Sequence, residues 1–140
     1  MSKIIYSFLL ITFSQLTGEI KAQAHVTSVI ETLATYTQKK TSPKYGMASF
    51  YAKKFGGRKT SNGAKYSSRE MTAACNVLPL GTWVKVTNIR NGKSVVVLIN
   101  DHLHHGTKRL IDVSKTAAQK LDFISSGVTK VKVEVAGKPA

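Results

Sequence analysis

The stretch Thr72–Asp112, TAACNVLPLGTWVKVTNIRNGKSVVVLINDHLHHGTKRLID, carries the clearest structural signal in the sequence. Two strand-like runs, Trp83–Ile89 and Ser94–Asn100, flank the dipeptide Asn91-Gly92. An Asn-Gly pair between two such runs favours a tight hairpin turn. The second run leads directly into Asp101, so the sheet is expected to deliver a carboxylate at a strand end.

The rest of the domain adds short elements around this hairpin. Gly46–Lys53 alternates small or apolar with polar residues and predicts a strand. Val128–Val135 alternates as well, with its valines at 131, 133 and 135 expected to point inward. Ser114 is an N-cap candidate for a helix over Lys115–Leu121, whose inner side would carry Ala117, Ala118 and Leu121. Lys54–Tyr66 is expected to be a loop and Met71–Cys75 a short apolar piece. Many short strands with one helix predict a mainly β protein built as a small closed barrel.

The N-terminus has the features of a secretory signal peptide. Lys3 supplies a positive charge, and Ile4–Phe13 is an apolar run of ten residues, too short to span a membrane. Ala22-Gln23-Ala24 offers a small-x-small cleavage site, so we expect cleavage after Ala24 and a soluble exported protein, periplasmic or secreted. The absence of a cysteine at this site argues against a lipid anchor. The alternative interpretation is a buried N-terminal helix.

The signal-peptide prediction divides the sequence into three segments. Residues 1–24 are the signal peptide. Residues 25–44 are polar and basic, with a weak helical pattern over Val26–Ala34, and are expected to form a flexible tether with one or two helical turns. Residues 45–136 are expected to form the compact barrel domain.

The charge balance is strongly basic, with 21 Lys and Arg against 7 Asp and Glu. Loss of residues 1–24 removes Lys3, Lys21 and Glu19, which leaves 19 − 6 = +13. Such a surface attracts polyanions. Export favours anionic polymers of the cell envelope over nucleic acid. Cys75 is the one cysteine, so no internal disulfide can form. We separately expect the protein to be a monomer.

Six carboxylates remain in the mature chain: Glu31, Glu70, Asp101, Asp112, Asp122 and Glu134. Asp101 is the best catalytic candidate because of its position at a strand end, although an aspartate that caps a turn is the alternative. Asp112 is expected to tie the barrel to the start of the helix instead.

Other polar and aromatic residues suggest further possibilities. His102, His104 and His105 have close spacing suited to zinc, but a polar loop that lines a groove is the simpler interpretation, and we expect no metal or other cofactor. Cys75 is expected to be a buried, unreactive thiol rather than a nucleophile or redox sensor. Loop cations could bind polyanions or sugars, and nearby aromatic rings could stack on sugars or fill the core: Lys53, Lys54, Arg58, Lys59, Lys65, Tyr51, Phe55 and Tyr66.

Four segments, in order, resemble the rare lipoprotein A (RlpA) family: GMASFYAKKFGGRKTSNGAKY, MTAAC, LPLGTWVKVTNIRNGKSVVVLIND and RLIDVSKTAAQKL. The resemblance covers about residues 46–135. It implies a six-stranded double-psi β-barrel with one short embedded helix. It also implies a lytic transglycosylase that cleaves peptidoglycan glycan strands poor in stem peptides.

The resemblance identifies candidate site residues and departures from the family pattern. Asn100-Asp101 matches the family, whereas Ala64 stands where the family has Glu and Cys75 where it has His. The segment His102–His105 replaces the family's Arg-Gly-Pro-Phe. We expect Asp101 to be catalytic and the following residues to contact the glycan: Asn62, Tyr66, Asn100, Arg58 and Lys65.

Two functions of different classes therefore stay open. A lytic transglycosylase uses the sugar's own C6 hydroxyl as nucleophile, so a single carboxylate, Asp101, can act as acid and then as base. The alternative is a non-catalytic, expansin-like module that binds cell-wall glycan. Ala64 and Cys75 favour the binding module, and Asp101 favours the enzyme.

Overall fold

The computed structural model describes residues 21–35 and 42–140, which fall into two compact units divided between Thr41 and Ser42. In the first unit, residues 21–35 form one exposed α-helix, longer than the one or two turns expected in the tether. Val26, Val29, Ile30 and Leu33 recur at helical spacing within this helix. Among the described residues, no helix is long and apolar enough to span a membrane.

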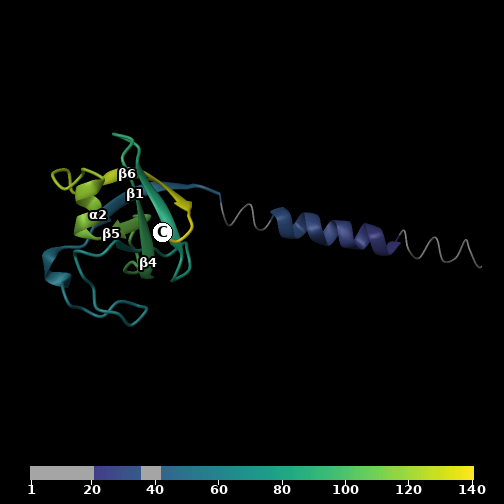
Figure 1. The fold of residues 1–140 in the computed structure, drawn as a ribbon, viewed down its shortest axis with the longest axis horizontal. Coiled ribbons are helices and arrows are strands. Elements are labelled where there is room, and N and C mark those ends of the chain that lie inside the picture. The colour runs from purple at the N-terminus through teal and green to yellow at the C-terminus, as the bar shows by residue number, and fades with distance from the viewer. Residues whose placement is uncertain (1–20, 36–41) are drawn as a thin grey trace, which may run out of the picture. The chain divides into compact units, whose positions relative to one another are not determined.

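The second unit is a closed barrel of six strands in the order β1-β5-β2-β4-β3-β6 (Figure 1). The elements are β1 Lys44–Phe50, the 3₁₀-helix η1 Lys53–Phe55, β2 Thr72–Ala74, β3 Trp83–Asn88, β4 Ser94–Asp101, β5 Ile111–Val113, α2 Lys115–Lys120 and β6 Thr129–Val135. Two neighbouring pairs are parallel, β1 with β5 and β2 with β4, and the other four are antiparallel. This confirms the mainly β barrel with one short helix.

The predicted hairpin of β3 and β4 forms, with Trp83 opposite Leu98 and Thr87 opposite Ser94. Its turn is wider than a two-residue loop, because the Asn88 amide donates to the Lys93 carbonyl and Gly92 donates back to Asn88. Gly92 has a φ of 75°, the left-handed conformation that favours glycine. The Asn-Gly dipeptide therefore marks the hairpin correctly but not the length of its turn.

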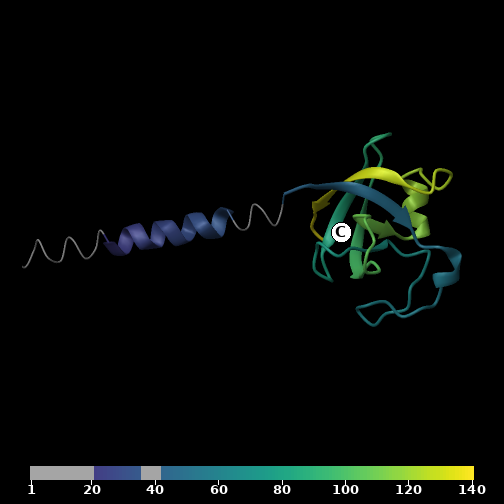
Figure 2. The same ribbon diagram turned by 180° about the vertical axis from the view of Figure 1, so that it is seen from behind.

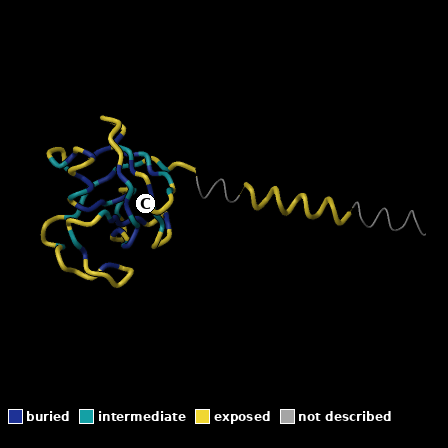
Figure 3. Tube along the Cα trace, in the orientation of Figure 1, coloured by how far each residue is buried: buried dark blue, intermediate teal, exposed yellow. Residues whose placement is uncertain are grey.

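Aliphatic side chains from all six strands fill the barrel interior, and α2 packs against one side of the barrel. Buried stretches of the trace lie within the barrel, and exposed stretches follow its loops (Figure 3). Ser114 caps α2 as predicted, since its hydroxyl accepts a hydrogen bond from the Ala117 amide. Ala117, Ala118 and Leu121 are buried, as expected. Val131 and Val133 also point inward, but Val135 is 42% exposed because it lies at the end of β6.

A buried amide, Asn88, connects three parts of the barrel. Its Nδ2 donates to the carbonyl of Leu121 at the end of α2 (2.9 Å), and its Oδ1 accepts from the hydroxyl of Thr129 at the start of β6 (2.9 Å). Both partners are also buried. A buried polar group of this kind is tolerated only when its hydrogen bonds are satisfied, so Asn88 fixes the end of the helix against two strands.

The first strand begins at Lys44 and ends at Phe50, earlier than the predicted end at Lys53. After Phe50 the chain enters η1 and a long loop that extends on one side of the barrel (Figure 2). The strand prediction fails here because Ala52 is followed by a local turn, in which the Phe55 amide donates to the Ala52 carbonyl. The loop returns to the sheet at β2.

Close packing of β1 against the segment before β5 generates a stability prediction. A Cβ atom at Gly46 would lie 2.6 Å from Leu110 Cβ, which is closer than atoms can approach. We expect Gly46→Ala to lower the free energy of unfolding by about 1–3 kcal/mol through overpacking. Urea unfolding measures this change. Gly137→Ala is the control, because nothing lies within 4 Å of its Cβ position; an equal loss in both variants would contradict the packing explanation.

Candidate active site

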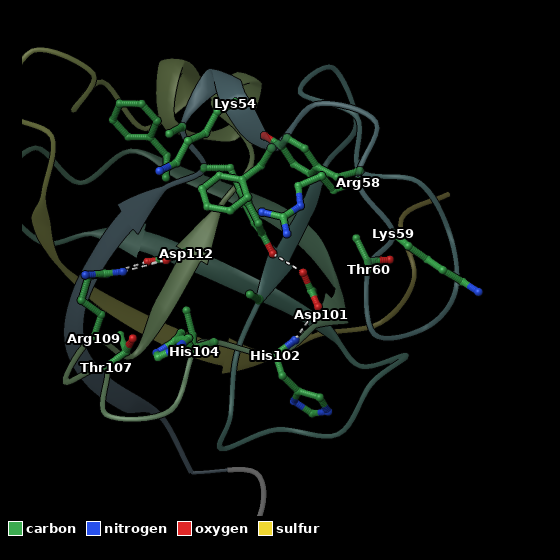
Figure 4. Close-up of a pocket in the computed structure, with 17 residues that line it drawn as sticks. Lys54, Arg58, Lys59, Thr60, Asp101, His102, His104, Thr107, Arg109 and Asp112 are labelled. Atoms are coloured by element: carbon green, nitrogen blue, oxygen red, sulfur yellow. Dashed lines mark hydrogen bonds and ion pairs between the residues drawn. The ribbon is translucent and has the colours of Figure 1, made fainter.

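A groove of about 650 Å³ is lined by residues from β1, β2, β4 and β5 and from the loops that follow β1 and β4 (Figure 4). Its lining mixes aromatic, cationic and acidic side chains with small ones: Phe50, Tyr51, Ala52, Lys54, Phe55, Arg58, Lys59, Thr60, Tyr66, Ala74, Asp101, His102, Leu103, His104, Thr107, Arg109 and Asp112.

The floor of the groove follows from strand register. Ala74 is paired with Asp101 of β4 on one side and with Asp112 of β5 on the other. Asp101 and Asp112 therefore lie on two strands that are separated by β2, and Ala74 lies between them. Neighbouring strands are about 4.8 Å apart, so a small residue at 74 leaves open space between two acids.

Asp101 is held by hydrogen bonds from three directions. Oδ2 accepts from the Tyr51 hydroxyl (2.7 Å). Oδ1 accepts from the Ser61 hydroxyl (2.6 Å), the Ser61 amide (2.9 Å) and the His102 amide (2.9 Å). Tyr51 follows β1 and Ser61 belongs to the long loop, so one carboxylate joins three separate segments.

These contacts decide the charge of Asp101. Partial burial raises the pKa of the carboxyl group, but the hydrogen bonds from Ser61, Tyr51 and the His102 amide outweigh it and hold the pKa below the ordinary value. Asp101 is therefore ionised at neutral pH. Burial, followed by the bond to Asp101, raises the pKa of Tyr51, so this phenol stays protonated.

Asp112 also lines the groove, which corrects the expectation that it ties the barrel to the helix. Arg109 binds it through two hydrogen bonds, Nε to Oδ1 (2.7 Å) and NH2 to Oδ2 (2.9 Å). This pair raises the pKa of Arg109 and neutralises the second carboxylate. The alternation of Ile111 and Val113 around Asp112, both fully buried, was a signal in the sequence that Asp112 faces away from the core.

The predicted substrate contacts divide into two groups. Arg58 and Tyr66 line the groove, whereas Asn62, Asn100 and Lys65 do not. Asn100 is 4% exposed and points into the protein. The Asn62 side chain accepts from the Thr60 hydroxyl (2.7 Å) and the Ala64 amide (3.1 Å), so it shapes the loop. Lys65 pairs with Lys59 in an isolated bridge.

The two positions that depart from the family pattern lie outside the groove lining. Ala64 is exposed in the loop that carries Ser61. Cys75 is fully buried within the core, and burial raises the pKa of its thiol. Its backbone is close to the site, because its amide donates to the Asp101 carbonyl (3.0 Å) and its carbonyl contacts His102 Nδ1 (3.4 Å).

The sequence did not decide whether the aromatic side chains near the site contact sugars or fill the core. Tyr51 stacks on Tyr66 with ring centroids 4.3 Å apart and meets the edge of Phe55 at 5.9 Å. Tyr66 is buried, its hydroxyl oxygen has no hydrogen-bond partner of good geometry in the described chain, and burial raises its pKa. Tyr66 therefore supports Tyr51 from behind, whereas Tyr51 and Phe55 are half-buried and face the groove.

His102 and His104 line the groove, whereas His105 does not. Within residues 21–35 and 42–140, no three His, Cys, Asp or Glu side chains are placed to hold a metal ion together. The chemistry available on the described surface is thus that of one ionised carboxylate beside phenol, hydroxyl, imidazole and cationic groups.

A closed six-stranded barrel with two parallel strand pairs and one short helix has the architecture of a double-psi β-barrel. Residues 44–133 match the family model described as "Lytic transglycolase". The chain belongs to this RlpA-like family.

Curated relatives are named endolytic peptidoglycan transglycosylase RlpA. The chain is 51% identical over 89 residues to the protein of Neisseria meningitidis serogroup A, covering 64% of this chain and 37% of that one. It is 44% identical over 105 residues to the protein of Haemophilus influenzae, covering 71% and 37%. The chain thus spans little more than a third of the length of these relatives.

Solved structures with the same fold are more distant in sequence. An expansin from Clavibacter michiganensis superposes with a TM-score of 0.56 at 21% identity, covering 71% of this chain and 52% of that one. The Streptomyces papain inhibitor gives the same TM-score and identity, covering 69% and 96%. These likenesses confirm the barrel and carry no further conclusion about activity.

The charge of Asp101 generates a pH prediction. The pKa of Asp101 in the folded protein lies below its value of about 4 in the unfolded chain. The ionised carboxylate therefore stabilises the fold at pH values above about 4, and this stabilisation is lost as the pH falls through the folded pKa. We expect the stability difference between the wild type and Asp101→Asn to be largest at neutral pH and to shrink as the pH falls below the unfolded value of about 4. Urea unfolding at several pH values measures it. A difference that is independent of pH would contradict an ionised Asp101.

Proposed function

We propose that this chain is a lytic transglycosylase that cleaves peptidoglycan glycan strands and leaves 1,6-anhydro ends. The observation that carries the proposal is Asp101 on the floor of a groove, held by four donors in a fixed orientation. The family to which the chain belongs and the names of its curated relatives support the same activity.

The reaction needs one proton removed and one proton delivered. The C6 hydroxyl of the sugar attacks its own anomeric carbon, so the O6–C1 bond forms as the C1–O bond to the next sugar breaks. The proton that leaves O6 balances the proton that the departing oxygen gains. Asp101 is the group placed to carry out both transfers, as acid at the departing oxygen and as base at O6.

The hydrogen bonds to Asp101 favour its role as a base over its role as an acid. The hydrogen bonds that keep Asp101 ionised leave few molecules with the protonated carboxyl group needed to start as an acid. Ala64 supplies no second carboxylate, and Cys75 lies in the core, so neither offers the missing proton donor. We therefore expect weak activity at neutral pH that rises as the pH is lowered toward the pKa of Asp101.

The activity test compares three proteins on glycan strands freed of stem peptides, with mass spectrometry of anhydro ends as the readout. Asp101→Asn should lower the rate by about 10²–10⁴-fold because an amide cannot cycle a proton. It should keep glycan binding, because the amide has nearly the same shape. Ala64→Glu should raise the rate, because it restores a carboxylate on the loop beside the groove. Cys75→His is not a useful companion, because it would force an imidazole into the fully packed core.

The second candidate function is a glycan-binding module without catalysis. The burial of Cys75 and the lack of a carboxylate at Ala64 favour it. If the wild type and Ala64→Glu both bind glycan but produce no anhydro ends as the pH is lowered from neutrality to below the ordinary aspartate pKa of about 4, the enzyme proposal fails and the binding module stands.

We also infer that the protein is exported, with cleavage after Ala24 and action in the periplasm or outside the cell. The support is the charge, apolar run and small residues at the N-terminus, most of which lie outside the described residues. Mass spectrometry of protein recovered outside the cytoplasm should find an N-terminus at His25. Recovery there with Met1 intact would contradict this inference.

A further inference from the structure

Two cations on the wall of the groove share one aromatic ring. Lys54 Nζ lies 5.5 Å from the centre of the Phe55 ring, and Arg58 Cζ lies 5.4 Å from it. The backbone fixes this arrangement, because the Arg58 amide donates to the Phe55 carbonyl (3.1 Å). Figure 4 shows Arg58 turned toward the groove and Lys59 turned away from it.

Neither cation has an acidic partner in the part of the chain that the structure describes. The ion pairs found there are Lys93 with Asp122, Arg109 with Asp112, and Lys132 with Glu134. The two carboxylates of the groove are already satisfied, Asp112 by Arg109 and Asp101 by four hydrogen-bond donors. Lys54 and Arg58 therefore form a positive wall of the groove that no carboxylate of the described residues pairs with.

Tyr51 connects Asp101 to the group formed by Lys54, Phe55 and Arg58. Tyr51 donates to Asp101 with its hydroxyl and meets the edge of Phe55 with its ring. Two aromatic rings thus separate the reactive carboxylate from the two cations. A glycan bound along this wall would place one sugar at Asp101 and a neighbouring sugar against Phe55.

We propose that Lys54, Phe55 and Arg58 form a subsite for a carboxylate-bearing sugar next to the bond at Asp101. A guanidinium matches the two oxygens of a carboxylate, and an aromatic ring packs on the apolar face of a sugar. This inference rests on the proposed function and adds the feature of the substrate that the groove recognises. In peptidoglycan the carboxylate is that of the lactyl ether, which is free where the stem peptide has been removed; uronic acids present the same group.

The test measures binding by calorimetry on the Asp101→Asn protein, so that strands stay intact. The probes are peptide-free glycan strands, the same strands with their carboxyl groups methyl-esterified, and uronate oligosaccharides of equal length. We expect the free strands to bind about tenfold more tightly than the esterified ones, because charge-assisted hydrogen bonds are lost on esterification. Raised salt should reduce this preference. Tight binding of uronate supports a general carboxylate subsite, and weak binding of uronate supports one specific for the lactyl group.

Matched variants separate a local subsite from the overall charge of the protein. Lys54→Gln with Arg58→Gln should remove the preference for free strands. Arg90→Gln with Lys130→Gln removes the same formal charge from exposed positions outside the groove and should keep it. Equal loss in both pairs, or equal binding of free and esterified strands, overturns the subsite. Formation of anhydro ends by the wild type is scored separately, so failure of the subsite and failure of the proposed function are distinguishable.

Discussion

Closure of the barrel through β1 is the constraint on which the rest of the structure depends. β1 pairs in parallel with β5 and antiparallel with β6, so a strand from the start of the domain joins two from its end. β2 pairs in parallel with β4 and antiparallel with β5, so Ala74 lies beside both Asp101 and Asp112. The Tyr51 hydroxyl reaches Asp101 from the segment after β1, so the groove depends on pairings between segments that are far apart in sequence.

The hydrogen bonds around Asp101 serve two purposes that conflict. By accepting from Tyr51 and Ser61, Asp101 holds the long loop and the end of β1 against the end of β4. The same bonds stabilise its ionised form, whereas the proposed mechanism requires Asp101 to donate a proton first. If Asp101 is the catalytic group, the bonds that fix the loop also reduce its strength as an acid. A second acid would relieve this conflict, and position 64 is where the family pattern has one.

Local patterns predicted most of the fold and one part of the site. The β3–β4 hairpin, the Ser114 cap and the inward alanines of α2 depend on neighbours within a few residues, so their signals are visible in the sequence. Asp101 was predictable because a strand visibly ends there. The partners of Asp101 were not, since Tyr51 and Ser61 lie 50 and 40 residues away and are brought in by barrel closure. Asp112 was misassigned for the same reason: its place beside Ala74 exists only once β2 and β5 pair.

The closed strand order also limits how other molecules can attach to the barrel. In the portion of the chain that the structure describes, each of the six strands has a neighbour on both sides. A sheet without a free edge offers no row of unpaired backbone groups to which an incoming peptide can add a strand. The same feature protects the domain from joining other copies edge to edge. Molecules that recognise this barrel must therefore read its side chains.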